Sequence, residues 1–419
     1  IKMLRRDMRH AGADAHILTT LDEIAWLLNV RGNDIPCTPV FLSYALITET
    51  ECKLFIQNAA VPEPVRTYLD GIGVTLLPYD SIYGEIQKLE HLSLLLEKAK
   101  VNYRLVSALS PTVRVIDQMN PCVMRKVVKN PVEIENVRRV HLRDGLAVTR
   151  FMHWLKCSVG EIPLSELSVA QKLEEFRKEQ DGYIEPSFVT IAAYGDNAAM
   201  CHYRANEEQN RGILPQGLLL IDSGGQYLGG TTDITRTYPL GPLTEDEKRF
   251  YTWTLQCHID LAKAVWLDYC ECKMIDTIAR EPLWRHLINY RCGTGHSVSF
   301  VGNVHEGPHA LNSRNTTRMH PGMVVTDEPG VYETDLVGIR IENELVCVHK
   351  ADNQYGTFLG FEPLMFVPIA TSPILPGVLD KDEIAWLNDY HRQVFAKLAP
   401  HLNDEERSWL AEKCAAIGC

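Results

Sequence analysis

The sequence predicts two domains: an α/β domain over residues 1–124, followed by an α+β domain with a curved antiparallel sheet over residues 125–419. A chain of 419 residues is too long for one ordinary core. Helical and strand-like patterns alternate up to residue 124. After Asn130-Pro131 the patterns become longer, and proline there suits the first turn of a new helix. These observations place the domain boundary near residue 125.

The first domain is predicted to alternate short helices with short strands. The expected helices cover residues 3–8, 21–28, 61–69 and 80–89, and the expected strands cover 15–19, 40–48, 53–57 and 74–77. Such alternation is typical of an α/β domain.

The second domain combines longer helices with strands that are bounded by glycine turns. Helical patterns cover residues 132–156, 165–180, 245–266 and 274–289, and strand patterns cover 217–222, 231–238, 322–327 and 338–348. This mixture predicts an α+β domain and argues against a doubly wound parallel sheet.

Composition excludes several classes of partner. The net charge is −12, and no dense block of Lys and Arg appears, so a nucleic-acid partner is not expected. The short run Arg125-Lys126, with Lys129, is predicted to be a solvated approach to a helix. No window of about 18 apolar residues exists, so no membrane partner is expected. Twelve scattered cysteines without a CxxC pair favour a reducing, cytoplasmic compartment.

Two aspartates are the first candidates for chemistry. Asp222 and Asp233 each lie in a strand-like stretch, with Gly224-Gly225 and Gly229-Gly230 between them. A hairpin at these glycines would bring both carboxylates together. Asp222 follows an apolar run, where burial of an acid is costly unless the acid is paired or binds a metal. The alternative is that both are ordinary turn-flanking aspartates.

Three residues further along the chain favour a metal site over ordinary turn-flanking aspartates. His296 follows a glycine-rich segment, Glu328 follows an apolar strand, and Glu342 lies within an alternating strand. Carboxylates and an imidazole suit Mn²⁺, Co²⁺, Fe²⁺ or Zn²⁺. Four acids would overcharge one ion, whereas two ions that share bridging carboxylates balance the charge better.

In this order and with these flanks, the acids and the histidine resemble the pita-bread metallopeptidases, and most closely the three-domain Xaa-Pro aminopeptidases (aminopeptidase P). Segments 21–32, 195–203 and 303–308 resemble the second domain and the histidine segments of that family, and 361–364 and 386–391 resemble its C-terminal extension. The resemblance implies a creatinase-like domain over 1–124 and a pita-bread catalytic domain over 125–419, with the extension from about residue 360. On this resemblance, the family's first domain is expected to be absent from this sequence.

The resemblance also implies a role for each candidate residue. The implied ligands of two metal ions are Asp222, Asp233, His296, Glu328 and Glu342, with Asp233 and Glu342 bridging the ions. The implied catalytic residues are Glu328, which takes the proton of the attacking water, and His202, His305 and Arg340. His202 and His305 would also bind the substrate, and Arg340 would support the carboxylates.

The function implied by the resemblance is hydrolysis of an N-terminal Xaa-Pro peptide bond by a bridging water activated by two metal ions. The ions would be Mn²⁺, with Co²⁺, Zn²⁺ and Fe²⁺ as alternatives, and the enzyme would be a homodimer. Two alternatives remain open: a prolidase that acts on dipeptides, and a non-catalytic pita-bread binding protein. Binding proteins and creatinase-like hydrolases of this fold lack some of the five ligands, all of which are present here.

The chain departs from the family pattern close to the implied site. Cys292 stands where the family usually has histidine, and Ser297 and Ser299 stand where it usually has glycine. A thiol cannot donate as an imidazole does, so the pocket near the leaving proline is expected to differ.

Overall fold

The computed structural model describes residues 1–418 and divides into two compact units, with the boundary between Lys126 and Val127. The predicted fold class is confirmed: the first unit is α/β, and the second is α+β with a curled antiparallel sheet. Within the described residues, no helix is both long and apolar enough to cross a membrane.

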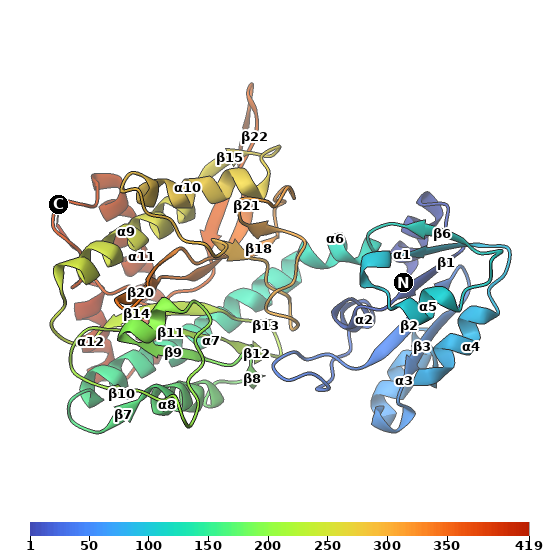
Figure 1. Cartoon of the computed structure of the whole chain (residues 1–419), viewed down its shortest axis with the longest axis horizontal. Coiled ribbons are helices and arrows are strands. Elements are labelled where there is room, and N and C mark those ends of the chain that lie inside the picture. The colour runs from blue at the N-terminus through green and yellow to red at the C-terminus, as the bar shows by residue number, and fades with distance from the viewer. Residues whose placement is uncertain (419) are drawn as a thin grey trace. The chain divides into compact units, whose positions relative to one another are not determined.

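A six-stranded mixed sheet forms the centre of the first unit (Figure 1). Its strand order is β4-β3-β2-β1-β5-β6, where the strands are β1 (Ala15–Leu18), β2 (Ser43–Thr48), β3 (Cys52–Ile56), β4 (Thr75–Pro78), β5 (Ser93–Leu96) and β6 (Arg114–Asp117). The helices are α1 (Lys2–His10), α2 (Leu21–Leu28), α3 (Glu63–Gly71), α4 (Ile82–Gln87), α5 (Tyr103–Ser107) and α6 (Pro121–Val127). The parallel pairs β1–β5, β3–β4 and β5–β6 explain the alternation of helices and strands in the sequence.

The prediction of a solvated basic run is wrong for both of its lysines. Lys126 is 3% exposed, and its ammonium donates a hydrogen bond to Asp22 over 2.5 Å. Lys129 is 4% exposed and pairs with Glu306 over 2.5 Å. A buried ammonium is tolerated only when it is paired, and both acids lie far away in the sequence, where no local pattern reveals them.

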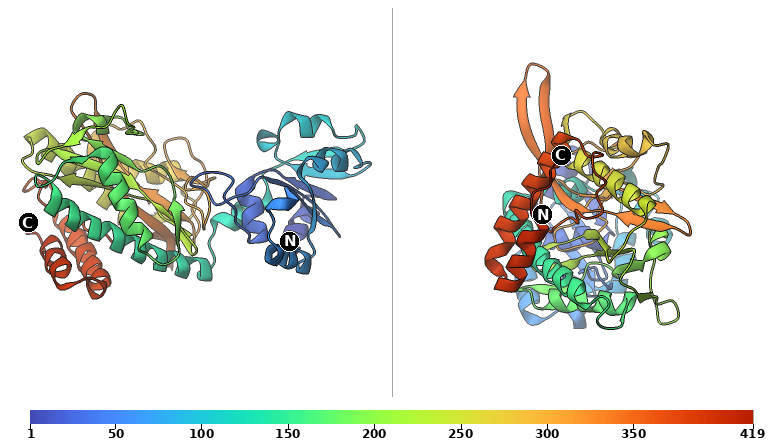
Figure 2. Two further views of the ribbon diagram at one scale, coloured as in Figure 1. Left: turned by 90° about the horizontal axis from the view of Figure 1, so that it is seen from below. Right: turned by 90° about the vertical axis from the view of Figure 1, so that its left-hand side faces the viewer.

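Six helices belong to the second unit: α7 (Pro131–Ser158), α8 (Glu166–Lys178), α9 (Glu245–Ala262), α10 (Cys272–Trp284), α11 (Lys381–Leu398) and α12 (Asp404–Lys413). Helix α7 begins at a capping box in which the Asn130 side chain accepts from the Glu133 backbone and the Glu133 side chain accepts from the Asn130 backbone. Helices α11 and α12 pack beside α7 (Figure 2).

Two of these helices end earlier than predicted. Helix α9 stops at Ala262, because Val265–Leu267 form strand β15 against β22 (Gly356–Pro363). Helix α10 stops at Trp284 and contains Pro282, and Leu287 then adopts a left-handed conformation with φ of 59°. The helical periodicity of the sequence continues past both ends and does not reveal them.

Antiparallel strands make up the sheets of the second unit that carry the candidate acids. One sheet has the order β14-β11-β9, with β9 (Ile191–Tyr194), β11 (Leu218–Ser223) and β14 (Ile234–Pro239), and another has the order β15-β22-β21-β18, with β18 (Val324–Asp327) and β21 (Asn343–Asn353). The shorter strands are β7 (Leu164–Ser165), β8 (Tyr183–Pro186), β10 (Gly212–Ile213), β12 (Gly225–Tyr227), β13 (Gly230–Thr231), β16 (Gly295–His296), β17 (Ala310–Leu311), β19 (Gly330–Glu333) and β20 (Val337–Arg340).

Candidate dinuclear metal centre

The first two candidate acids come from the paired strands β11 and β14. Asp222 lies opposite Thr235 in the antiparallel register, and Asp233 directly precedes β14. The Asp233 backbone N–H donates to Glu344 over 2.6 Å, which fixes the turn into the strand. Both aspartates are buried, at 9% and 4% exposure.

His296 and Glu328 are brought together by two close strands, β16 and β18. A Cβ atom on Gly295 would lie 1.9 Å from the Thr326 carbonyl oxygen, so only glycine permits this approach. The Thr326 hydroxyl accepts from the His296 backbone N–H at 3.0 Å and donates to the Glu328 carboxylate at 2.9 Å. As a result, the His296 Nε2 atom lies 3.4 Å from a Glu328 oxygen.

Glu342 enters the same space from the junction of β20 and β21. Its backbone N–H donates to the Thr235 carbonyl over 3.1 Å, and its carboxylate accepts from the Thr235 hydroxyl over 2.6 Å. These bonds join the segment around Glu342 to the β11–β14 pair.

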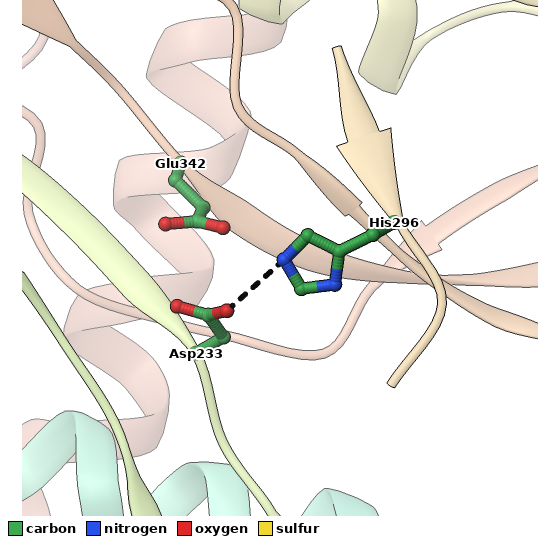
Figure 3. Close-up of side chains that lie close together, drawn as sticks. All are labelled: Asp233, His296 and Glu342. Carbon is green, nitrogen blue, oxygen red and sulfur yellow. Dashed lines mark ion pairs between the residues drawn. The ribbon is translucent and has the colours of Figure 1, made fainter. Parts of the chain in front are cut away.

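Ligand-type atoms of Asp233, His296 and Glu342 all lie within 4.8 Å of one another. Figure 3 shows the three side chains pointing toward one another from separate segments, and the His296 Nε2 atom lies 3.4 Å from the nearer Asp233 oxygen. Asp222 and Glu328 line the same cavity as this trio. Thus the structure gathers all five predicted ligand residues in one place.

The carboxylates of this cluster carry more negative charge than the nearby side chains neutralise. Burial, together with the charges of Asp222 and Glu328, raises the pKa of Asp233 well above its ordinary value. Burial and the charge of Asp233 do the same to the pKa of Glu342. One carboxylate oxygen of Asp222 and one of Asp233 are buried without a hydrogen-bond partner. A carboxylate and imidazole set with unsatisfied oxygens fits divalent cations.

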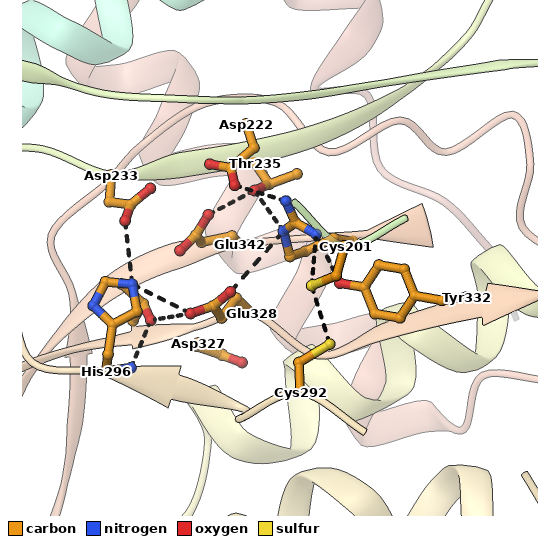
Figure 4. Close-up of polar contacts among 12 residues, drawn as sticks. Cys201, Asp222, Asp233, Thr235, Cys292, His296, Asp327, Glu328, Tyr332 and Glu342 are labelled. Atoms are coloured by element: carbon orange, nitrogen blue, oxygen red, sulfur yellow. Dashed lines mark hydrogen bonds and ion pairs between the residues drawn. The ribbon is translucent and has the colours of Figure 1, made fainter. Parts of the chain in front are cut away.

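The Arg340 guanidinium lies close to the side chains of Asp222 and Glu328, two of the acids that Figure 4 labels. It donates to Asp222 over 2.6 Å and to the Tyr332 hydroxyl over 2.7 Å, and its Nε atom lies 4.0 Å from Glu328. A single fixed cation orients these side chains but does not neutralise the cluster.

The two predicted substrate histidines lie at the edge of the same site. The His305 ring lies 4.1 Å from the His296 ring, centroid to centroid. His202 and His305 are exposed and line a cavity of about 390 Å³ together with Arg340 and the four acids and one histidine described above. This volume lies within the range of small-ligand sites.

Several residues of the site were not singled out from the sequence. Thr235, Thr326 and Tyr332 hydrogen-bond to the candidate residues, and Glu344 lies behind Asp233. Their only sequence signal is proximity: each stands within two to eight positions of a candidate on the same or an adjoining strand. Which polar neighbour turns inward depends on strand pairing.

The two serine departures acquire partners in the structure. The Ser299 hydroxyl donates to Glu306 over 2.9 Å, and the Ser297 hydroxyl accepts from the Gly307 backbone N–H. Both serines therefore hold the segment that directly follows His305.

Three protein-family models match consecutive parts of the chain. Residues 135–349 match metallopeptidase family M24, residues 1–133 match the creatinase/prolidase N-terminal domain, and residues 357–417 match the C-terminal region of peptidase M24.

Similar curated proteins carry aminopeptidase names. An Aminopeptidase P2 from Arabidopsis thaliana is 37% identical over 97% of this chain and 62% of its own length. A probable Xaa-Pro aminopeptidase P from Laccaria bicolor is 38% identical over 100% of this chain and 67% of its own length. The chain thus spans about two thirds of the length of these relatives.

Solved structures agree in fold. An X-prolyl aminopeptidase from Caenorhabditis elegans, described as a cytosolic enzyme with a di-nuclear active site, matches 99% of this chain and 70% of its own at a TM-score of 0.94 and 34% identity. A prolidase from Pyrococcus furiosus matches 86% of this chain and 98% of its own at a TM-score of 0.68 and 23% identity, which supports the fold alone. The chain belongs to metallopeptidase family M24 and, within it, to the Xaa-Pro aminopeptidases.

Proposed function

We propose that this chain is a two-metal aminopeptidase that hydrolyses the peptide bond between an N-terminal residue and a following proline. The observation that carries the proposal is the convergence of Asp233, His296 and Glu342 within 4.8 Å, beside Asp222 and Glu328 in one cavity. When bound in such a set of ligands, divalent ions supply Lewis acidity and lower the pKa of water.

Each side chain of the cluster has its own proposed role. Asp222 would hold one ion, His296 and Glu328 would hold the other, and both ions would share Asp233 and Glu342. Glu328 lies at the cavity surface and is placed to accept the proton of the attacking water. Arg340 holds Asp222 in position through a 2.6 Å hydrogen bond.

Proline in the second position poses a specific recognition problem. An Xaa-Pro bond has no N–H, so a site cannot hold it through that donor. Contact with the peptide around the scissile bond is assigned to His202 and His305, and their place in the lining of the cavity supports this assignment. The free amine would bind a metal ion or an acid of the cluster, which would fix the cut after one residue.

A peptide series tests this assignment. Arg-Pro-Pro should be cleaved after arginine, whereas Arg-Ala-Pro and N-acetyl-Arg-Pro-Pro should resist cleavage. Gly-Pro, a dipeptide, separates the aminopeptidase from a prolidase, because only a prolidase should prefer it. Rapid cleavage of the alanine or acetylated peptide would overturn the proposal, and so would a preference for Gly-Pro.

The native metal is proposed to be Mn²⁺. Its support is the all-oxygen and nitrogen ligand set, which lacks a thiolate that would favour softer ions. Reconstitution of the metal-free protein with Mn²⁺, Co²⁺, Zn²⁺ and Fe²⁺ in parallel tests this choice, and higher turnover with any of the other three would contradict it.

A cytoplasmic homodimer is proposed as the working form. The scattered cysteines support a reducing compartment, and the eleven in the described chain form no disulfide. The family resemblance supports the dimer. Light scattering on the purified protein would give twice the chain mass of 47.4 kDa if the dimer is right, and the single chain mass if it is wrong.

A further inference from the structure

Two cysteines face each other across the cavity of the candidate site. The Sγ atoms of Cys201 and Cys292 lie 3.0 Å apart, although the residues are 91 positions apart in the sequence, and both line the cavity with His202 (Figure 4). Both thiols are free. We propose that this pair is a reversible oxidation site: a peroxide converts it to a disulfide, and the disulfide lowers peptidase activity by displacing His202. The effect on activity rests on the proposed function, whereas formation of the disulfide does not.

The geometry allows bond formation with a small movement. A disulfide requires sulfurs about 2.05 Å apart, so the two Sγ atoms must approach by about 1 Å. The backbone at Cys292 is held firmly, because its carbonyl accepts from Arg280 over 2.8 Å. Arg280 is itself fixed by an ion pair of 2.8 Å with Asp276 and a bond of 2.7 Å to the Tyr290 carbonyl.

The Cys201 side is therefore the side that moves. Cys201 lies in a turn that follows the 3₁₀ segment Gly195–Ala199, outside regular structure. Within the turn, the Tyr203 backbone N–H donates to the Met200 carbonyl over 3.0 Å, and the Tyr203 hydroxyl anchors the end of the turn to Glu166 over 2.8 Å, so the movement falls on Cys201 and His202. Because His202 is the next residue after Cys201, a shift of this turn changes the position of the His202 ring over the cavity.

The surroundings favour a reactive thiolate at Cys201. The hydrogen bond from Cys292 and the nearby Arg340 guanidinium lower the pKa of Cys201 to about 6, against the opposing effect of burial. The Arg340 Nη1 atom lies 3.9 Å from the sulfur. The same hydrogen bond raises the pKa of Cys292, which keeps its proton. A thiolate next to a cation is the form that reacts with peroxide.

Other thiols of the second unit differ from this pair. Burial raises the pKa of Cys272, Cys347 and Cys414 to about 12 in each case. Cys157 is exposed, and its sulfur lies 3.7 Å from the His153 ring. The buried Cys272 and Cys347 and the half-buried Cys414 should resist oxidation, and Cys157 supplies an exposed control that lies outside the cavity.

The reaction balances with hydrogen peroxide as the oxidant. The Cys201 thiolate attacks one peroxide oxygen, the O–O bond breaks, and a sulfenic acid and hydroxide form. Cys292 then attacks the sulfenic sulfur and releases hydroxide, and its thiol proton converts hydroxide to water. Overall, two thiols and one peroxide give one disulfide and two waters.

The experiment treats the full chain with hydrogen peroxide and follows two measurements in parallel. Peptide mapping by mass spectrometry without reduction should find the 201–292 linkage, and dithiothreitol should remove it. Hydrolysis of Arg-Pro-Pro should fall about 10-fold or more, since a displacement of about 1 Å at a catalytic site can cost up to 10²-fold. Cys201→Ser, Cys292→Ser and the control Cys157→Ser are each compared with their own untreated activity.

The outcomes separate the parts of the proposal. Loss that is reversed by dithiothreitol in the wild type and in Cys157→Ser, but absent in Cys201→Ser and Cys292→Ser, supports it. Failure to find the linkage while Cys157 becomes oxidised would overturn the oxidation site. A complete linkage with unchanged activity would overturn the displacement of His202. If the untreated protein does not cleave Arg-Pro-Pro at all, the proposed function fails, and the linkage is still decided by the peptide map.

Discussion

Both units bury acidic side chains, but they balance the charge in opposite ways. In the first unit, Glu23 accepts a hydrogen bond of 2.9 Å from Asn120, and Lys100 lies 3.9 Å from its other oxygen. The His16 ring contacts the Asn120 side-chain oxygen at 2.9 Å, which continues the network. Every one of these contacts comes from the protein itself.

In the second unit, the protein supplies too few hydrogen-bond donors and positive charges for the acids around Asp233. Oxygens of Asp222 and Asp233 have no partner, and Arg340 is one cation among several carboxylates. A buried polar network that is closed by its own side chains indicates a structural role, whereas one that keeps excess charge and open oxygens indicates a ligand. The predictions below test this contrast from the largest expected effect to the smallest.

Removal of metal should abolish peptide hydrolysis and loosen the second unit alone. A ligand present at 1,000 times its dissociation constant stabilises the folded state by about 4 kcal/mol, and that contribution is lost on chelation. Hydrogen exchange measured by mass spectrometry should rise in residues 218–236 and 324–346 and stay constant in residues 15–28. Mn²⁺ should reverse both effects. Full turnover in a sample verified as metal-free would refute the metal centre.

Glu328→Gln should lower kcat by about 10³-fold, because it removes a general base, which typically contributes 10²–10⁴-fold. KM should change far less, since the loss falls on the transition state. Steady-state kinetics on Arg-Pro-Pro gives both constants. Glu333→Gln, which lies on the neighbouring strand β19 outside the cavity lining, is the matched control. A kcat within about threefold of wild type would contradict the base assignment.

His202→Ala should slow turnover by about 10²-fold, the lower end of the range for one lost transition-state donor. Because His202 is not among the proposed ligands, metal content per chain should stay constant, as measured by plasma emission spectrometry. His349→Ala, at an exposed site on β21, should leave both quantities unchanged. Loss of metal in the His202 variant would make this residue a ligand and would revise the site.

Glu23→Gln should change the pH dependence of stability in the first unit. Burial, followed by the charge of Asp22, raises the pKa of Glu23 from 4.5 to about 7, so the folded state favours the protonated acid. Its contribution is complete below pH 4.5 and is lost as the pH rises through about 7. The loss is on the order of 3 kcal/mol, from the size of the shift.

The glutamine variant should therefore be more protected than wild type at pH 8 and similar to it at pH 4.5. Hydrogen exchange of residues 15–28, compared between variants at the same pH, measures this difference without interference from intrinsic rates. Glu90→Gln, at an exposed position, is the control and should follow wild type at both values. An equal difference at both pH values would show that Glu23 does not titrate as proposed.

Local sequence patterns predicted much of the secondary structure. The strand around Asp222 and the capped start of α7 appear near their predicted positions, because alternation and capping act within a few residues. The ends of helices α9 and α10 were harder to predict. Val265 pairs in a strand and Leu287 adopts a left-handed conformation, and the periodicity of the sequence encodes neither.

The sequence by itself was enough to predict the fold class and the family. Helix and strand patterns indicated the fold class and the order of the two domains, and five ligand-type residues in a characteristic order on strand-like segments indicated the family. Only the tertiary structure decided which distant side chains meet. Lys126 with Asp22, Lys129 with Glu306, and Cys201 with Cys292 are pairs between residues separated by 91 or more positions. Such contacts depend on how whole strands and loops pack, because burial and partner distance are properties of the folded chain and no short window of residues contains them.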